Sequence, residues 1–344
     1  MRAIVEPVAI YAWAILAGAA FNWLGVPLPW MVGPLIGVAM LYMTDLTRFR
    51  VPVETRPLGQ MIVAAQVGLS FTPAALGVLL NLAPLLIGVA LATAACACLC
   101  AWLLTRMSGM GPVEALLSTM PTSPVEAATI AERLGLQPGV IVFAQTLRIA
   151  AVVVIVPVAI YALEGWPDRG SASLGLLDPG KSAMLFAVAL SVAMLFRFLG
   201  ISNPYFLGAL AGSAGLTAAG IEPAPFGPVI LGAAQVLLGT WLGSTFRRSL
   251  FRSAGRMIGS VMVSTVIFLA MTGALGVTLA GLLSMGWQEL VLGAAPGGVT
   301  EMALTAKFLG LDVALITAFH IVRIFLIVPF VPAFAARLKR AKSR

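Results

Sequence analysis

The chain has 344 residues, of which 60% are hydrophobic and 10% are charged, and its mean hydropathy is +1.03. Soluble domains are about half apolar and about a quarter charged, so this composition excludes a soluble globular protein. The formal charge of +8 does not indicate nucleic-acid binding, because most basic residues flank apolar segments, as the positive-inside rule expects. We therefore predict an all-α polytopic membrane protein that lies in a lipid bilayer, without a soluble catalytic domain or a nucleic-acid partner.

The first half contains five apolar runs, each long enough or nearly so to cross a hydrocarbon core of about 30 Å. They cover 3–23, 28–44, 57–80, 83–105 and 138–163. The fourth run holds Cys96, Cys98 and Cys100, which have no His, Asp or Glu beside them and are interpreted as small packing residues rather than metal ligands. Between the last two runs lies "GMGPVEALLSTMPTSPVEAATIAERLG", which is too short and too broken for an ordinary span.

The second half repeats the first at an offset of 175 residues. Glu114, Pro121, Glu126, Gly135 and Arg148 recur as Glu289, Pro296, Glu301, Gly310 and Arg323. The corresponding apolar runs cover 183–198, 204–220, 226–246, 257–283 and 312–335, and the interruption recurs as "APGGVTEMALTAKFLGLDVALI" over 295–316. This pattern predicts a duplicated membrane module, with one repeat over 1–170 and the other over 176–344.

Loop charges predict how the repeats are oriented. Basic residues cluster over 47–56, at Arg106, over 247–256 and over 337–344. If each interrupted element enters and leaves on one side, a repeat has five spans, and all four clusters and both termini face the cytoplasm. An odd number of spans makes the repeats inverted, as in many secondary transporters. Full crossing would give six spans and place 247–256 outside, so we predict ten spans and two re-entrant elements.

The two interruptions are the candidate binding elements. In lipid, non-helical backbone is tolerated only where it is buried in protein or lines a watery cavity. A short helix is predicted after each break, with Thr122 or Ser123 as its N-cap in the first repeat, and with Gly297 or Gly298 freeing the turn in the second. Such helix N-termini attract anions. The predicted binding residues of the breaks are Pro121, Thr122, Ser123, Pro296, Gly297, Gly298 and Thr300.

Ionisable residues follow each break. Glu126 and Glu301 fall in the first helical turn, where they could bind a coupling H⁺ or Na⁺ or act only as charges at a helix end. Arg148 and Arg323 come 22 residues later (148−126 and 323−301). They could pair with the glutamates of either repeat or extend to the membrane interface. One turn before each arginine stand Gln145 and His320, the latter either an interior residue or part of the site.

These motifs resemble a known family. The two copies of "P-x-x-x-x-E…LG" and the segment "GVPLPWMVGPLIG" are similar to the AbrB family of bacterial inner-membrane proteins over essentially the whole chain. That family has been labelled a regulator of gene expression and an ammonia monooxygenase. One histidine supplies no oxygenase metal site, and a DNA-binding regulator needs a soluble basic element. More distantly, "APGG…GLDVAL" resembles sodium/bile-acid and cation/proton antiporter carriers, which implies transport.

The sequence thus predicts an ion-coupled secondary transporter of a small anionic or zwitterionic solute, which is not an enzyme and needs no cofactor. The alternative is a membrane sensor or regulator that acts on gene expression through a partner. The solute, the coupling ion and the oligomeric state, a homo-oligomer included, stay open.

Overall fold

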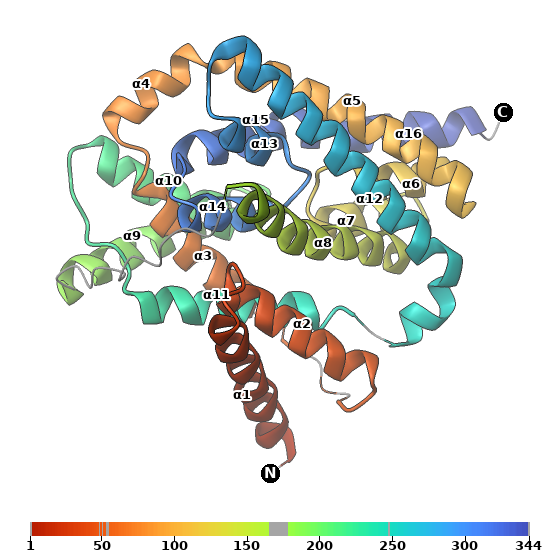
Figure 1. Ribbon diagram of the computed structural model, residues 1–344, viewed down its shortest axis with the longest axis horizontal. Coiled ribbons are helices and arrows are strands. Elements are labelled where there is room, and N and C mark those ends of the chain that lie inside the picture. The colour runs from red at the N-terminus through yellow and green to blue at the C-terminus, as the bar shows by residue number, and fades with distance from the viewer. Residues whose placement is uncertain are drawn as a thin grey trace. The chain divides into compact units, whose positions relative to one another are not determined.

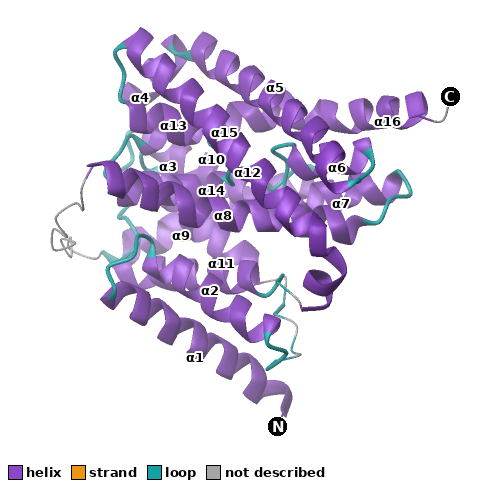
Figure 2. Cartoon of the chain, turned by 45° about the vertical axis from the view of Figure 1, so that its right-hand side comes forward, coloured by secondary structure: helices purple, strands orange, loops and turns teal. Residues whose placement is uncertain are grey.

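The computed structural model describes residues 2–47, 49, 51–52, 55–164, 178–246 and 248–342. In this part of the chain the regular elements are helices, with no strand (Figure 2). Those of the first half are α1 (Arg2–Trp23), α2 (Pro29–Met43), α3 (Thr55–Gly68), α4 (Pro73–Asn81), α5 (Ala83–Ser108), α6 (Pro112–Thr119), α7 (Pro124–Arg133) and α8 (Pro138–Glu164). Those of the second half, which follow along the ribbon of Figure 1, are α9 (Pro179–Phe198), α10 (Pro204–Ala218), α11 (Pro228–Gly243), α12 (Arg248–Leu283), α13 (Trp287–Ala294), α14 (Val299–Phe308), α15 (Val313–Ile327), the 3-10 helix η1 (Val328–Phe330) and α16 (Val331–Lys342). The prediction of an all-α polytopic membrane protein is confirmed.

Local backbone conformation recurs at the offset found in the sequence. Many helices begin with proline, whose fixed φ and missing N–H suit the first helical position, and α2, α6, α7 and α8 begin 175 residues before α10, α13, α14 and α15. The described residues with positive φ form pairs at the same offset: Gly25 and Gly200, Leu28 and Asn203, Asp45 and Gly220, Gly109 and Ser284, and Gly135 and Gly310. The two halves therefore repeat turn by turn. Their orientation across the bilayer stays a prediction.

The chain divides into two compact units that do not coincide with the repeats. Unit 1 comprises 1–80, 157–248 and 303–314, and unit 2 comprises 81–156, 249–302 and 315–344. Each repeat thus gives its first helices to unit 1 and most of its later helices to unit 2. The predicted boundary between the repeats, 170–176, and part of the basic clusters lie outside the described residues.

Unit 1 is built by reciprocal close contacts between the repeats. A Cβ on Gly68 of α3 would lie 2.8 Å from the carbonyl oxygen of Leu210 on α10, and a Cβ on Gly243 of α11 would lie 2.5 Å from that of Leu35 on α2. These contacts exchange equivalent positions, since 68 and 35 correspond to 243 and 210. Glycine is required at these positions because the backbones touch.

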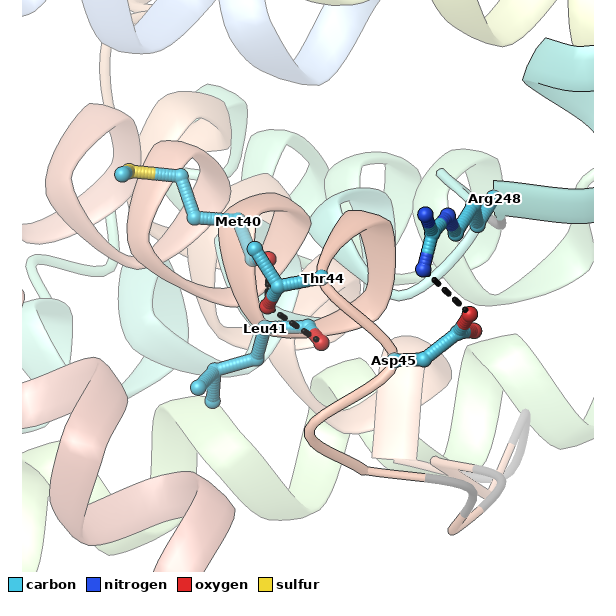
Figure 3. Close-up of polar contacts among 5 residues, drawn as sticks. All are labelled: Met40, Leu41, Thr44, Asp45 and Arg248. Carbon is cyan, nitrogen blue, oxygen red and sulfur yellow. Dashed lines mark hydrogen bonds and ion pairs between the residues drawn. The ribbon is translucent and has the colours of Figure 1, made fainter.

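The end of α2 is fastened to the start of α12 at the rim of unit 1. The hydroxyl of Thr44 donates to the carbonyl oxygens of Met40 and Leu41, and Asp45 accepts a hydrogen bond from Arg248 at 3.1 Å (Figure 3). Both side chains of this ion pair are exposed, at 43% for Arg248 and 58% for Asp45. An exposed ion pair contributes only about 0–1 kcal/mol to stability. This contact therefore positions the loop after α2 and adds little to the stability of unit 1.

Unit 2 packs around an apolar core that surrounds both parts of the first broken element. Leu117 on α6, Ala127 and Ala131 on α7 and Ile141 on α8 are fully buried, and they belong to the same apolar cluster as Phe268 on α12. Cys100 is buried on α5 among them, whereas Cys96 and Cys98 are half-buried, and all three thiols are free. The cysteines therefore serve as small packing residues, as predicted.

The described helices confirm some predicted spans and correct one. Five helical segments are long and apolar enough to cross a membrane, over 83–108, 138–164, 179–198, 257–283 and 313–341. The run 57–80, predicted as one span, is wrong as a single helix, because α3 and α4 meet at a bend of 87°. Thr72 caps α4 by accepting from the Ala75 N–H at 3.2 Å, and Pro73 begins the new helix. α2 and α11, at 15 and 16 residues, are shorter than the roughly 20 of an upright span, so the total of ten stays a prediction.

The close approach of α11 to α2 can be tested with matched alanine variants. A Cβ on Gly239 would lie 2.3 Å from the carbonyl oxygen of Met31, whereas the nearest atom to a Cβ on Gly232 of the same helix, in Trp30, is 3.9 Å away. We expect Gly239→Ala to lower the free energy of unfolding by about 1–3 kcal/mol through overpacking. Gly232→Ala should be neutral or raise it by up to about 1 kcal/mol. Thermal unfolding in detergent measures both, and equal midpoints would contradict the packing described.

Candidate functional site

Each predicted binding element is two short helices separated by a non-helical break. Residues 120–123 separate α6 from α7, and residues 295–298 separate α13 from α14. All thirteen predicted site residues lie in unit 2. Pro121, Thr122, Gln145, Arg148, Pro296, Gly297, Thr300, His320 and Arg323 are buried, whereas Ser123, Glu126, Gly298 and Glu301 are half-buried. The site residues that were predicted from the two halves of the sequence therefore all lie in one compact unit.

The helix after the first break has the predicted cap. Ser123 is the N-cap of α7, and its hydroxyl accepts from the Glu126 N–H at 3.2 Å. The Glu126 carboxylate accepts in turn from the Ser123 N–H at 3.2 Å. This capping box satisfies two backbone donors and places a negative charge at the positive end of the helix.

The second break has a related arrangement around glycine. Glu301 is the third residue of α14, and a Cβ on Gly298 would lie 2.0 Å from its carboxylate oxygen. The carboxylate therefore folds back over the start of its helix. Neither Gly297 nor Gly298 adopts a positive φ, so the prediction that these glycines free the turn is wrong. At Gly297 the lack of space for a side chain explains the glycine, because a Cβ would lie 3.1 Å from the sulfur of Met302.

Both arginines bind backbone carbonyl groups at the breaks. The Arg148 guanidinium donates from Nη1 to Ser118 at 3.2 Å and to Thr119, and from Nη2 to Met120 at 3.2 Å. The Arg323 guanidinium donates from Nη1 to Ala295 at 2.8 Å and from Nη2 to Gly297 at 3.0 Å. These carbonyls belong to the ends of α6 and α13 and to the residues just after them, so a cation lies where the helix dipole is negative.

The residues one turn before the arginines bind equivalent carbonyls. Gln145 Nε2 donates to Leu117 at 2.5 Å, and His320 Nε2 lies 3.0 Å from the carbonyl oxygen of Leu292. His320 Nδ1 lies 2.8 Å from Arg323 Nη2. Since the guanidinium can only donate, Nδ1 accepts and Nε2 carries the proton, which is the neutral form of the ring. Gln145 also donates to the hydroxyl of Thr122 at 3.0 Å.

The predicted pairing of glutamates with arginines in the same repeat is not formed. Among the described residues, neither guanidinium makes an ion pair with a carboxylate. Each Nε–H lacks a hydrogen-bond partner. Arg148 and Arg323 are each only 4% exposed, so unit 2 buries two positive charges without an ion-paired carboxylate among the described residues.

Two sets of functional residues were missed in the sequence. Glu114 caps Gly111 at the start of α6, with its carboxylate 3.0 Å from the amide nitrogen, and Glu289 folds over Gly286 at the start of α13. The recurring pair Glu114 and Glu289 was the available signal for this role. The second set consists of hydroxyl residues that line a cavity beside Arg148, namely Ser118, Thr119, Ser264 and Thr265. Their spacing in the sequence gave no signal, because α6 and α12 are far apart in the chain.

The role of His320 can be tested by replacing it with the residue of the other repeat. We expect His320→Gln to retain near-native stability, because the amide can donate to Leu292 and accept from Arg323. His320→Leu leaves these two buried groups unsatisfied and should lower the free energy of unfolding by about 1–3 kcal/mol. Thermal unfolding of the purified variants measures this difference. Equal stability of the two variants would show that the hydrogen bonds of His320 do not stabilise the break.

Comparison with known proteins places this chain in a family. Residues 30–339 match the AbrB family, described as "Transition state regulatory protein AbrB". The chain is 25% identical over 361 aligned residues to "Uncharacterized protein YhjN" of Bacillus subtilis (strain 168), which covers 94% of this chain and 91% of that protein. It is 22% identical over 333 residues to "Putative regulator AbrB" of Escherichia coli (strain K12), with 94% and 93% covered. Because the family match extends over most of its length, the chain belongs to the AbrB family.

Proposed function

We propose that this membrane protein is an ion-coupled secondary transporter of a small anionic or zwitterionic solute. The observation that carries the proposal is the burial of Arg148 and Arg323 in unit 2 without an ion-paired carboxylate among the described residues. A buried charge without a partner costs several kcal/mol. Backbone carbonyls at a helix end supply only about half a negative charge. A bound anion would supply the rest.

The breaks favour the same interpretation. Backbone that leaves the helix at membrane depth is found where it is buried in protein or lines a cavity, and paired broken helices carry the solute and ion sites of many transporters with inverted repeats. Here the two breaks follow equivalent short helices, and each is bound by an arginine from the following long helix. The solute would bind where these elements meet, with Thr122, Ser123, Gly297, Gly298 and Thr300 supplying its polar contacts.

We assign coupling to Glu126 and Glu301. Both carboxylates are half-buried, and Glu126 accepts a hydrogen bond from the backbone N–H of its N-cap. A protonated carboxyl accepts less strongly, so proton binding would loosen the start of α7. Na⁺ would compete for the same oxygens. A proton or Na⁺ gradient could thereby change the shape of the break.

The protein is proposed to lie in the bacterial inner membrane with both termini in the cytoplasm, since this orientation keeps the basic clusters inside. No enzymatic step is proposed, and its partners are the lipid bilayer, the solute and, in one arrangement, a second copy of the chain.

A membrane regulator is the second candidate function. One relative is named "Putative regulator AbrB", and the family description calls it a regulatory protein. A regulator would bind the solute without moving it and would signal through short basic loops. Deletion of the gene distinguishes the two functions on a panel of growth metabolites. A transporter gives a solute-specific growth defect, and a regulator gives changes in expression without loss of uptake.

Transport can be tested in proteoliposomes with radiolabelled organic acids and amino acids, under imposed proton or Na⁺ gradients. We expect Glu301→Gln to abolish the dependence of uptake on the gradient, because the amide does not take up a proton and lacks the negative charge that favours Na⁺. Glu289→Gln is the matched control, since Glu289 also folds over the start of its helix but precedes the break. Uptake by Glu301→Gln with an unchanged pH and Na⁺ dependence would refute the coupling assignment. Absence of uptake across the whole panel would refute transport.

A further inference from the structure

A small cavity lies beside Arg148 inside unit 2. Its volume is about 10 Å³, and its polar lining consists of Arg148, Ser118 and Thr119 at the end of α6, and Ser264 and Thr265 on α12, with Ala144 of α8 on its apolar side. A volume of this size accommodates about one water-sized particle. The cavity is therefore a position for a single atom rather than for a whole metabolite.

The guanidinium of Arg148, which lines this cavity, has one donor without a partner. Nη1 and Nη2 of Arg148 are engaged with backbone carbonyls, but Nε–H has no hydrogen-bond partner. An unpartnered buried donor costs free energy, and here it belongs to a permanently charged group that is only 4% exposed. This charge lines the cavity directly. The electrostatic field excludes a cation from the cavity and favours an anion.

The hydroxyl groups can adapt to such a ligand. Ser118, Thr119 and Thr265 now donate to carbonyls of their own helices, at 2.8, 3.0 and 2.8 Å, and Ser264 also lines the cavity. Hydroxyl hydrogens rotate, so each group can turn its hydrogen toward an anion while its helix stays intact.

In the second repeat, the ring of Phe319 occupies the position that is equivalent to this cavity. Position 144 corresponds to Phe319 and position 118 to Gly293. A Cβ on Gly293 would lie only 2.4 Å from the ring of Phe319. The ring therefore occupies the space that the Ser118 side chain occupies in the first repeat. The pair Ser118 and Ala144 leaves the cavity open, and the pair Gly293 and Phe319 closes it.

We propose that the cavity beside Arg148 is a binding site for one anionic atom, either a halide ion or one oxygen of a small carboxylate. The Arg148 Nε–H and the hydroxyls of Ser264 and Thr265 hold this atom. The site deepens the proposed function, on which it rests, by placing the negative end of the solute, or a halide that travels with it, beside Arg148.

The test measures anion binding by the purified full-length protein in chloride-free gluconate buffer. Bromide and formate are titrated separately, and the thermal midpoint is followed together with ⁸¹Br line broadening for bromide. We expect a saturable rise in the midpoint with at least one of the two. A response to bromide alone identifies a halide site, and a response to formate alone identifies a carboxylate site. If neither anion raises the thermal midpoint, the proposal is overturned and the cavity is a site for water.

Variants assign the binding to this cavity. The double variant Ser118→Gly with Ala144→Phe transfers the filled arrangement of the second repeat and should abolish the response. Ser264→Ala changes the volume little and should weaken binding about tenfold, which keeps the test informative if the double variant does not fold. The matched control is Thr278→Ala, because Thr278 lies exposed on the same helix with its hydroxyl bonded to Ala274. Binding that survives in both cavity variants overturns the assignment.

The outcomes are separable from those of the transport assay. Anion binding without uptake of any solute would refute transport and keep the site. Coupled uptake that is unchanged in the double variant, with no anion binding in the native protein, would refute the site and keep transport.

Discussion

The arrangement of unit 2 depends on one constraint, which is that backbone leaving a helix inside a bilayer must find hydrogen-bond partners. Arg148 and Arg323 supply them at the ends of α6 and α13. Glu126 and Glu301 supply the opposite charge at the starts of α7 and α14. Each break thus lies between a cation and an anion, placed where the helix dipoles favour them. The same hydrogen bonds hold α8 and α15 against the breaks. A change in the geometry of a break would therefore also move the helix that carries its arginine.

The sequence was sufficient to predict an all-α membrane protein, its two breaks and the cap of α7. Identical Glu, Arg, Pro and Gly residues at one offset are rarely coincident in an apolar chain, and Ser123 followed by Glu126 is a local capping signal. The bend between α3 and α4 was hidden, because "LSFTP" lies within a run that stays apolar on both sides. The separation of Glu126 from Arg148 was also hidden. A spacing of 22 residues does not reveal that the carboxylate folds back onto its own helix while the guanidinium reaches the preceding one.

The two breaks have diverged in a correlated way. The tips differ in sequence, with Thr122 and Ser123 opposite Gly297 and Gly298. The surroundings differ as well, since Ser118 and Ala144 in one half correspond to Gly293 and Phe319 in the other. From the first half to the second, one side chain becomes smaller (Ser118 to Gly293) and its neighbour becomes larger (Ala144 to Phe319). The two changes in volume compensate each other, so both halves stay close-packed. At the end of α6 the hydroxyl residues Ser118 and Thr119 lie beside Arg148, whereas the equivalent positions of α13 are Gly293 and Ala294. The duplicated elements are therefore structurally equivalent but chemically specialised.

The division of the chain into units bears on how such a protein could have arisen. Each compact unit takes helices from both repeats, and the contacts in unit 1 are reciprocal, with Gly68 against Leu210 and Gly243 against Leu35. A polypeptide of half this length would contain only one side of those contacts. An ancestor with a single repeat would have had to associate with a second copy of itself, inserted in the opposite direction if the repeats are inverted, before gene fusion joined the two. In such a history the two breaks would specialise only after fusion, because each half could then change without altering the other.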